Sequence, residues 1–331
     1  MDACRSKLLF VVTVQPKKFE LDWSLLQNYC IKQAMVERGV DVSMINWLDE
    51  SLTTEKIAKF DTVTFLWCDK YDQHPRKFEG FLRERLAAAL LQSAHLAIIN
   101  DIAVILWNYI KAVYLQQLES AGFKVPRTAY INDISSFASV DLLAAEVGRL
   151  GKLVSEPGLN PSVVVKPSIS ASSKQTYLIR DPFCLSDADV ECLSEIYDTG
   201  TDGSLMIQSY EPEIKKGELS LIYIAPSLRF AVKKVPIDGE FRCQSEFGGS
   251  TTMVPINAIP DTVKDIAESV LSYINDNVGQ LTYCRVDGVL RDSGDFVIME
   301  IEAIEPELFL EMSDNTEEKE ALCDALMKPR E

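Results

Sequence analysis

Several features that mark common functional classes are missing from this chain of 331 residues. It has only two histidines, and its eight cysteines are scattered without a Cys-x-x-Cys pair, which argues against a Cys/His zinc site and a disulfide framework. No apolar run reaches the length of a membrane span, and the N-terminus lacks the pattern of a signal peptide. We therefore expect a cytoplasmic protein with no membrane partner.

Positive charge is scarce as well. The chain carries 33 Lys and Arg against 50 Asp and Glu, a formal net charge of −17. Nucleic acids require a basic surface, so none is expected as a partner. A nucleotide remains compatible if cations gather locally at its site. The phosphate-binding motifs GxxxxGK[ST] and GxGxxG are both absent, so such a site would use lysines on separate elements.

The first hundred residues alternate strand and helix patterns. Apolar runs predict strands at 7–14, 40–47, 61–67 and 95–100, and helices are expected between them at 23–38, 54–60 and 75–93. This alternation predicts a parallel sheet flanked by helices. One further helix is expected from Ala103 to Ala121.

Strand patterns dominate after residue 151, with helices near 186–197 and 261–277. The expected strands are 162–166, 176–179, 205–210, 218–224, 228–235, 283–290 and 295–301. Short connections favour antiparallel pairing. The predicted organisation is an α/β parallel-sheet domain (1–102) followed by an α+β part with two subdomains (103–204 and 205–331).

Two acids interrupt the apolar strand FVIMEIE. Glu300 and Glu302 lie two residues apart, so both project from one face of the strand. The turn DSGD (292–295) predicts a hairpin that brings Asp287 close to them. Three carboxylates without His or Cys form a hard-oxygen site, which suits Mg²⁺ shared with phosphates.

Cationic partners are the alternative explanation for these acids. On a solvated sheet face they would pair with Arg285, Lys233 or Lys234. The metal interpretation predicts that Glu300→Gln abolishes turnover. Because one repelling charge is removed, the stability of the metal-free protein would then hold or rise slightly.

Two other segments have features of a nucleotide site. Lys166 ends the strand SVVVK, and the following PSISASSK offers hydroxyls, among them Ser170 and Ser172, and backbone N–H groups to phosphates. The strand LMIQSY ends in a polar connection that suits an adenine edge, and Glu218 could hold ribose hydroxyls. The proposed hinge residues are Gln208, Ser209, Tyr210 and Glu211. An ordinary strand–loop junction and a hairpin with a loop acid are the alternatives.

Together the segments VVVKPSISASS, IQSYEP–GELS, AVKKVP, FRCQSEFGGS and YCRVDG–VIMEIEAIEP resemble the ATP-grasp superfamily of ATP-dependent carboxylate ligases. The likeness is greatest to the cyclo-ligase branch, typified by the O-ureido-serine cyclo-ligase of cycloserine biosynthesis. It spans roughly residues 100–312. The resemblance implies a pre-ATP-grasp α/β domain followed by an ATP-grasp fold with two subdomains, with ATP and Mg²⁺ bound.

The resemblance also implies a role for each matching residue. Lys111 and Lys166 would contact the ATP phosphates. The residues implied for Mg²⁺ are Asp287, Glu300 and Glu302. Those implied for the transferred phosphate and the substrate carboxylate are Lys233 or Lys234, Arg242 and Arg285.

The substrate stays open, because LWCDKY (66–71) retains only Tyr71 of the branch's Arg-Ser-x-Trp-Asp-Tyr stretch. The expected activity is ADP-forming ligation of a small carboxylic or amino acid to an amine, through an acyl phosphate. Intramolecular ring closure by the same chemistry and a catalytically silent nucleotide-binding module are the alternatives. A homodimer is compatible with the sequence.

Overall fold

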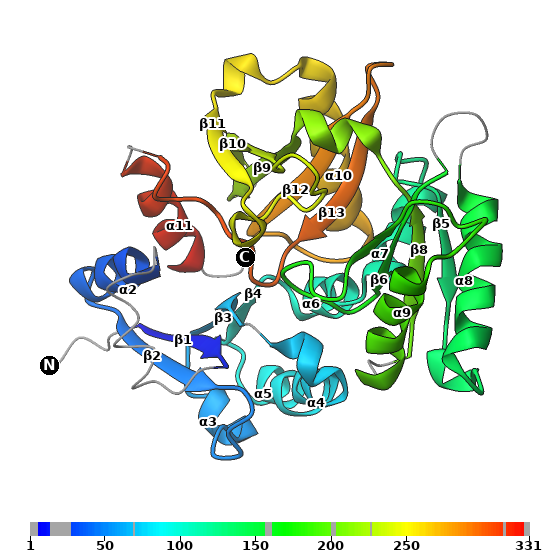
Figure 1. The fold of residues 1–331 in the computed structure, drawn as a ribbon. Helices are drawn as coiled ribbons and strands as arrows, with labels where there is room; N and C mark the ends of the chain where they lie inside the picture. The colour runs from blue at the N-terminus through cyan, green and yellow to red at the C-terminus, as the bar shows by residue number, and fades with distance from the viewer. Residues whose placement is uncertain are drawn as a thin grey trace, which may run out of the picture.

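The structure is a computed structural model that describes residues 6–13, 28–68, 70–155, 161–199, 203–225, 227–313 and 316–327. Its described residues form three β-sheets (Figure 1). The expected order, a parallel α/β part followed by antiparallel sheets, is confirmed. Within the described residues, none of the helices has both the length and the hydropathy of a membrane span.

The first sheet is parallel, with strand order β2-β1-β3-β4. Its strands are β1 (Lys7–Val12), β2 (Asp41–Asn46), β3 (Thr62–Trp67) and β4 (Ala97–Ile99). Strand β1 is buried on both faces: Leu8, Phe10 and Val12 belong to one apolar core, and Leu9 and Val11 to another. This two-sided burial explains the continuous apolar run in the sequence.

Helices cover both faces of this sheet. They are α2 (Asn28–Glu37), α3 (Thr54–Ile57), the continuous helical stretch α4 (Pro75–Gly80), η2 (Phe81–Leu86) and α5 (Ala87–Gln92), and the short η1 (Tyr71–Gln73). The expected helix at 75–93 is thereby confirmed, with Pro75 in its first turn. The first part of the helix expected at 23–38 lies outside the described residues.

The second sheet is antiparallel, with strand order β5-β8-β6-β7. Its strands are β5 (Thr128–Ile131), β6 (Val163–Pro167), β7 (Tyr177–Ile179) and β8 (Leu205–Ser209). Helices α8 (Val140–Val154) and α9 (Asp187–Thr199) pack on it through one apolar core. Because β8 pairs with β5 and β6, we propose that the boundary between the two subdomains lies after Ser209.

The third sheet is antiparallel, with strand order β11-β10-β9-β12-β13. Its strands are β9 (Glu218–Ile224), β10 (Ser227–Val235), β11 (Ser250–Val254), β12 (Tyr283–Leu290) and β13 (Phe296–Glu302). Helix α10 (Asp261–Asn277) lays its predicted apolar stripe on this sheet. The expected β12–β13 hairpin is confirmed, with Gly294 at a positive φ of 88° in its turn.

The helix expected from Ala103 to Ala121 is not continuous. The chain forms α6 (Ile102–Asn108) and α7 (Lys111–Ser120), separated by Ile110 in an extended conformation. At the break, the Lys111 N–H donates to the carbonyl of Ser168 at 2.8 Å, and the Asn108 side chain bonds to β13. Tertiary hydrogen bonds outside the helix thus end it early, and a helical sequence pattern does not reveal them.

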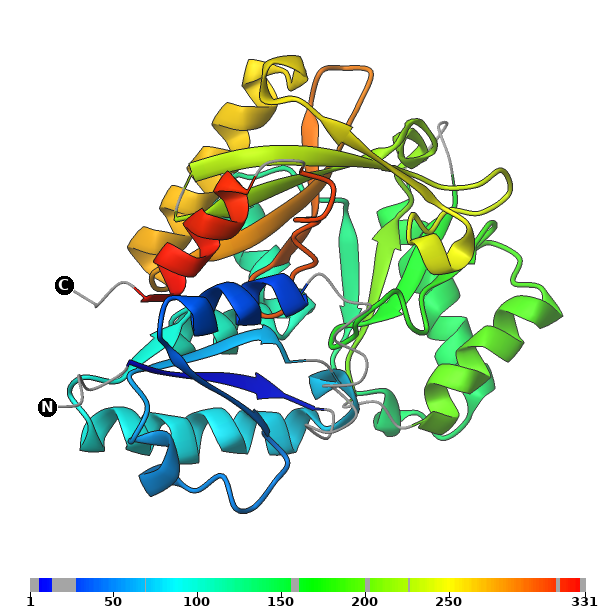
Figure 2. The ribbon, with the colours of Figure 1, turned by 90° about the vertical axis from the view of Figure 1, so that its left-hand side faces the viewer.

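The C-terminal helix α11 (Glu317–Met327) packs between the first and the third sheet. It lies beside α2 (Figure 2). Arg38 bonds to both Glu320 and Asp324. Its apolar side, including Leu322 and Leu326, enters the core that also contains strands of the first and third sheets. This packing ties the N-terminal sheet to the sheet that carries the acids.

Candidate active site

The β12–β13 hairpin places the predicted acids on one face of the third sheet. In its register Asp287 lies opposite Glu300, and Arg285 lies opposite Glu302. Directly opposed residues of an antiparallel pair point to the same side of a sheet. The Asp287 side chain is 2% exposed, whereas those of Glu300 and Glu302 are each 28% exposed. Asp287 is therefore buried, whereas Glu300 and Glu302 are partly exposed on the same face.

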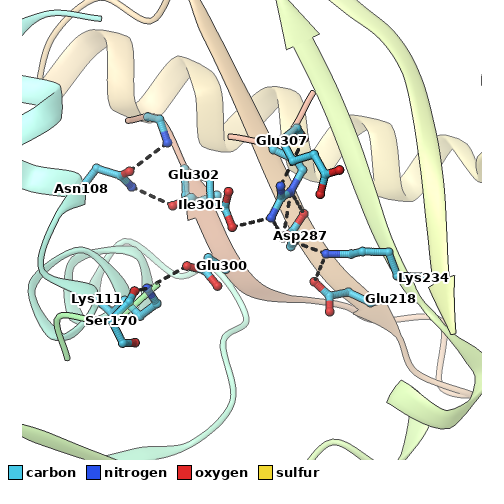
Figure 3. A network of polar contacts seen from close by, with 12 residues as sticks. Asn108, Lys111, Ser170, Glu218, Lys234, Asp287, Glu300, Ile301, Glu302 and Glu307 are labelled. Atoms are coloured by element: carbon cyan, nitrogen blue, oxygen red, sulfur yellow. Dashed lines mark hydrogen bonds and ion pairs between the residues drawn. The ribbon is translucent and has the colours of Figure 1, made fainter. Parts of the chain in front are cut away.

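The acids are paired with cations, as the interpretation without a metal predicted for Arg285 and Lys234. The Arg285 guanidinium donates to both carboxylate oxygens of Asp287, with Nε–Oδ1 and Nη2–Oδ2 distances of 2.8 Å, and also bonds to Glu302 (Figure 3). From β10, Lys234 Nζ lies 3.2 Å from Glu218 and 3.3 Å from Asp287. Charges this deeply buried require such pairing.

Lys111 connects the acids to the Ser-rich loop. As the first residue of α7, it places Nζ 2.9 Å from Glu300 Oε1 and 2.6 Å from the carbonyl oxygen of Ser170 (Figure 3). Its backbone N–H bonds to Ser168 in the same loop. Lys111 therefore holds both the base of the loop and one acid.

The pKa values of the acids differ because their cationic partners differ. Burial alone would raise the pKa of Asp287, but Arg285 and Lys234 outweigh it and lower the value. Burial likewise acts to raise the pKa of Glu300, and Lys111 with Lys166 lowers it below the usual range. For Glu302 burial dominates over Arg285 and raises the pKa to about 7.

Lys166 and the Ser-rich loop that follows it form a further part of the site. Lys166 belongs to β6, and burial lowers its pKa against the opposing charge of Glu300. In the loop, Ser172, Ser173 and Gln175 adopt positive φ values of 52°, 51° and 53°. Such values favour glycine, so this loop has a glycine-loop conformation built from other residues.

A cavity of about 900 Å³ lies at this site. Its lining joins Glu300, Glu302 and their cations to the loop residues 170–174 and to residues within 70–73 and 304–312. Asp287 and Glu218 are not among the lining residues. The predicted site residues that line it are Lys111, Lys166, Ser170, Ser172, Arg285, Glu300 and Glu302. Lys234 lines it as well, and Lys233 is not among the lining residues. On a strand, neighbouring residues face opposite sides, so Lys234 and not Lys233 reaches the acids.

Arg242 pairs with an acid of its own segment. Its guanidinium donates to both carboxylate oxygens of Glu240 and stacks 3.6 Å from the ring centroid of Phe247. It is not among the residues lining the cavity, although Cys243 to Phe247 are. Arg242 thus supports the segment that lines the cavity and does not bond to the acids in this structure.

The proposed hinge residues lie at the end of β8, outside the lining of this cavity. Gln208 is 1% exposed and donates to Thr128 Oγ1 at 3.1 Å. The Ser209 hydroxyl is buried without a hydrogen-bond partner among the described residues. The Tyr210 N–H donates to the carbonyl of Ser162. Glu211 is buried and forms a bidentate ion pair with Arg291, with an Nη2–Oε1 distance of 2.6 Å and an Nε–Oε2 distance of 2.8 Å.

The donor set is suited to Mg²⁺, which prefers carboxylate oxygens. Among the described residues, however, no group of three acids, histidines or cysteines is close enough to hold a metal ion as it stands. The reason is visible in the contacts: Arg285 and Lys111 hold the carboxylates of Glu302 and Glu300. Both of these side chains border the cavity, so they can turn toward an arriving ion.

Some residues of the site could not be identified from the sequence. Asn108 lines the cavity and bonds to β13, while residues 70–73 and 304–312 contribute much of the remaining wall. The motif WNYIK contained the only usable signal, because Asn108 lies three residues before Lys111. An interpretation as one continuous helix concealed that both side chains turn to the same strand.

Comparisons with known proteins agree with this geometry. The model of the prokaryotic glutathione synthetase ATP-grasp domain matches residues 129–281. No curated protein matches the sequence significantly. Among solved structures, the D-cycloserine synthetase DcsG is 18% identical, with 96% of this chain and 99% of that chain covered and a TM-score of 0.72.

Two further structures extend the likeness. The D-alanine–D-alanine ligase from Bacillus anthracis, complexed with ATP, is 13% identical over 98% of this chain and 96% of that chain, with a TM-score of 0.64. The ATP-grasp ligase PsnB, complexed with a phosphomimetic variant of its minimal precursor, Mg and ADP, is 19% identical over 98% of both chains, with a TM-score of 0.59.

These matches confirm the predicted fold, a parallel α/β domain followed by an ATP-grasp fold. They also agree with the expectation of an ADP-forming ligase that joins C and N and uses ATP and Mg²⁺. The domain match over residues 129–281 and the structural similarity along nearly the whole chain lead to one conclusion: this chain has the ATP-grasp fold.

Proposed function

We propose that the protein is an ATP- and Mg²⁺-dependent ligase that activates a small carboxylic or amino acid as an acyl phosphate and transfers it to an amine. The observation that carries this proposal is the acidic face of β12 and β13, which meets Lys111, Lys166 and the Ser-rich loop across one cavity. Both sets of groups that phosphoryl transfer needs, cations and hard-oxygen donors, are present there.

Mg²⁺ would be held by Asp287, Glu300 and Glu302, and would neutralise charge on the transferred phosphate. Lys111 and Lys166 would bind the ATP phosphates, with the hydroxyls and backbone N–H groups of the loop as further donors. In this proposal Lys111 exchanges its carboxylate partner Glu300 for a phosphate, so this cation need not be desolvated anew. The positions of both lysines are already fixed by secondary structure.

Arg285 and Lys234 would orient the reacting groups. Both lie at the cavity wall and carry permanent positive charge, since the carboxylates beside them raise the pKa of each despite the opposing effect of burial. They would hold the substrate carboxylate against the γ-phosphate and stabilise the charge that develops on transfer. No side-chain nucleophile takes part, because the substrate carboxylate itself attacks phosphorus.

Other lining residues of the cavity would receive the amine. Tyr71, Asp72 and Glu311 line the cavity together with the apolar side chains of Phe309 and Met312. Carboxylates suit an ammonium group, and the apolar pair suits a short side chain. Gln208 to Glu211 and Glu218 would bind adenine and ribose, which requires the nucleotide to extend past the residues that line the cavity.

The test is ATP turnover with a panel of small carboxylic acids and amines, with ADP and phosphate measured separately. We expect ADP release that requires a carboxylic acid, Mg²⁺ and an amine. Trapping of the acyl group by hydroxylamine, as a hydroxamate, would identify the acyl phosphate. Mg²⁺-dependent ATP binding without release of ADP, whatever the panel, would instead favour the silent binding module.

Intramolecular ring closure is the second candidate, supported by the similarity to D-cycloserine synthetase over nearly the whole chain. In that case a single substrate carries both the carboxylate and the amine. ADP release with one bifunctional compound alone, and a product lighter than the substrate by one water, would favour cyclisation over ligation.

A further inference from the structure

In the described part of the chain, strand β13 is an edge strand, and its outer side carries backbone groups that no neighbouring strand pairs. Beside Glu302 these groups are the carbonyl of Ile301 and the N–H of Ala303. The Asn108 carboxamide bonds to both: Nδ2 donates to Ile301 O at 2.8 Å, and Oδ1 accepts from Ala303 N at 2.8 Å (Figure 3). One side chain thus replaces a missing strand at this point.

A second asparagine holds the carbonyl of the same Ala303. Asn100 follows β4 and is fully buried. Its Nδ2 donates to the carbonyls of Ala303 at 2.7 Å and Tyr283 at 2.8 Å, and its Oδ1 accepts from the N–H groups of Thr282 and Tyr283. Both hydrogen-bonding groups of the residue after Glu302 are therefore held by side chains from the segment between β4 and α7.

The placement of these contacts links them to the acids. The direction in which a strand residue projects follows from the backbone on each side of it. Asn108 fixes the backbone immediately before and after Glu302. Three residues later, Lys111 bonds to the side chain of Glu300. One short segment, at the break between α6 and α7, therefore fixes both partly exposed acids of the site.

We propose that Asn108 is a positioning residue for magnesium binding: it holds the edge of β13 so that the Glu302 carboxylate meets the ion beside Glu300. This inference rests on the proposed function, in which these acids hold Mg²⁺. Residues that orient metal ligands contribute about ten- to a hundredfold to metal affinity. Asn108 makes no contact with the metal itself in this proposal.

The test compares Asn108→Ala with a matched control, Asn46→Ala. Asn46 also donates to a backbone carbonyl (Thr13) and accepts from a backbone N–H (Leu48), but it belongs to β2 and is not among the residues lining the cavity. Thermal unfolding is followed with saturating ATP over a Mg²⁺ titration. We expect Asn108→Ala to raise the Mg²⁺ concentration for half-maximal stabilisation about ten- to a hundredfold.

The control is expected to keep the wild-type Mg²⁺ requirement, although both variants lose two hydrogen bonds and some metal-free stability. Equal Mg²⁺ titrations for the two variants, with a normal wild-type response, would overturn the positioning role and leave the proposed function intact. A wild-type protein without any Mg²⁺-dependent response to ATP would overturn both.

Asn108→Ser provides a second variant in case the alanine protein does not fold. Its hydroxyl is too short to reach both backbone groups, so the same increase in the Mg²⁺ requirement is expected. Because Asn108 borders the cavity, water can enter the space that either substitution opens. A serine variant with the wild-type Mg²⁺ requirement would count against the inference as directly as the alanine result.

Discussion

For Glu300→Gln, the sequence and the structure lead to opposite expectations for the stability of the metal-free protein. From the sequence, loss of one repelling charge was expected to preserve or raise the stability of the metal-free protein. The structure contradicts the premise, because Glu300 is paired with Lys111 at 2.9 Å and the Lys111 side chain is only 11% exposed. Its like-charged neighbour Asp287 is already balanced by Arg285 and Lys234.

The expected cost follows from these contacts. Removing one partner of a fully buried ion pair costs about 3–5 kcal/mol. Glu300 is 28% exposed, and the glutamine oxygen can still accept from Lys111, which also keeps its bond to Ser170. We therefore expect Glu300→Gln to lower the free energy of unfolding by about 1–3 kcal/mol in metal-free buffer. Turnover is expected to be lost.

A double-mutant cycle measures this directly. The proteins are wild type, Glu300→Gln, Lys111→Met and the double variant, each unfolded in urea without metal. The double variant should be more stable than the sum of the single effects predicts, with a coupling of about 1–2 kcal/mol. Unchanged or increased stability of Glu300→Gln, or a coupling near zero, would refute the reasoning.

Three other predictions concern the nucleotide, the hinge and the metal. Lys166→Ala should weaken ATP binding, measured by calorimetry, by roughly ten- to a hundredfold, because a charge-assisted hydrogen bond to phosphate is worth about 1.5–3 kcal/mol. Lys174 is exposed, so Lys174→Ala should have only a small effect, and equal effects would argue against a phosphate-binding role for the loop. Arg291→Ala leaves the buried Glu211 without its ion pair and should destabilise the protein by about 2–4 kcal/mol. Lys216→Ala, in an exposed ion pair, should cost at most about 1 kcal/mol, so similar urea midpoints for the two variants would contradict the prediction. A chelator should abolish thermal stabilisation by ATP but leave the nucleotide-free midpoint unchanged, since cations already balance the acids without metal; a fall in that midpoint would show that the metal is part of the resting fold.

The order of elements was predictable from the sequence because each depends on a local pattern. The two-sided burial of β1 produces a continuous apolar run, and the stripe on α10 repeats at helical spacing. The turn sequence at Gly294 predicted the hairpin, which brings Asp287 opposite Glu300. Helix α8 has a strong apolar stripe too, and it could have been predicted from Leu143, Val147 and Leu150.

The break between α6 and α7 could not be predicted in the same way. Nothing in the local sequence opposes a continuous helix there, since no proline or glycine occurs between residues 102 and 120. The helix ends because Asn108 and Lys111 form bonds with β13 and the Ser-rich loop, nearly 200 and 60 residues away. The choice between Lys233 and Lys234 likewise required the register of β10, because a shift by one residue exchanges the two faces.

The balance of charge at the site bears on how the ligand must arrive. Four carboxylates, Glu218, Asp287, Glu300 and Glu302, share their surroundings with four cations, Lys111, Lys166, Lys234 and Arg285. A triphosphate alone would add several negative charges to this balanced site, in a protein whose net charge is already −17. Because charge is costly to bury without a counterion, ATP should bind together with one or two Mg²⁺ ions and only weakly without them. In the proposed function, Lys111 would turn from Glu300 to the phosphates and the carboxylates would turn to the metal, so the ion pairs of the free protein would preorganise both sets of ligands.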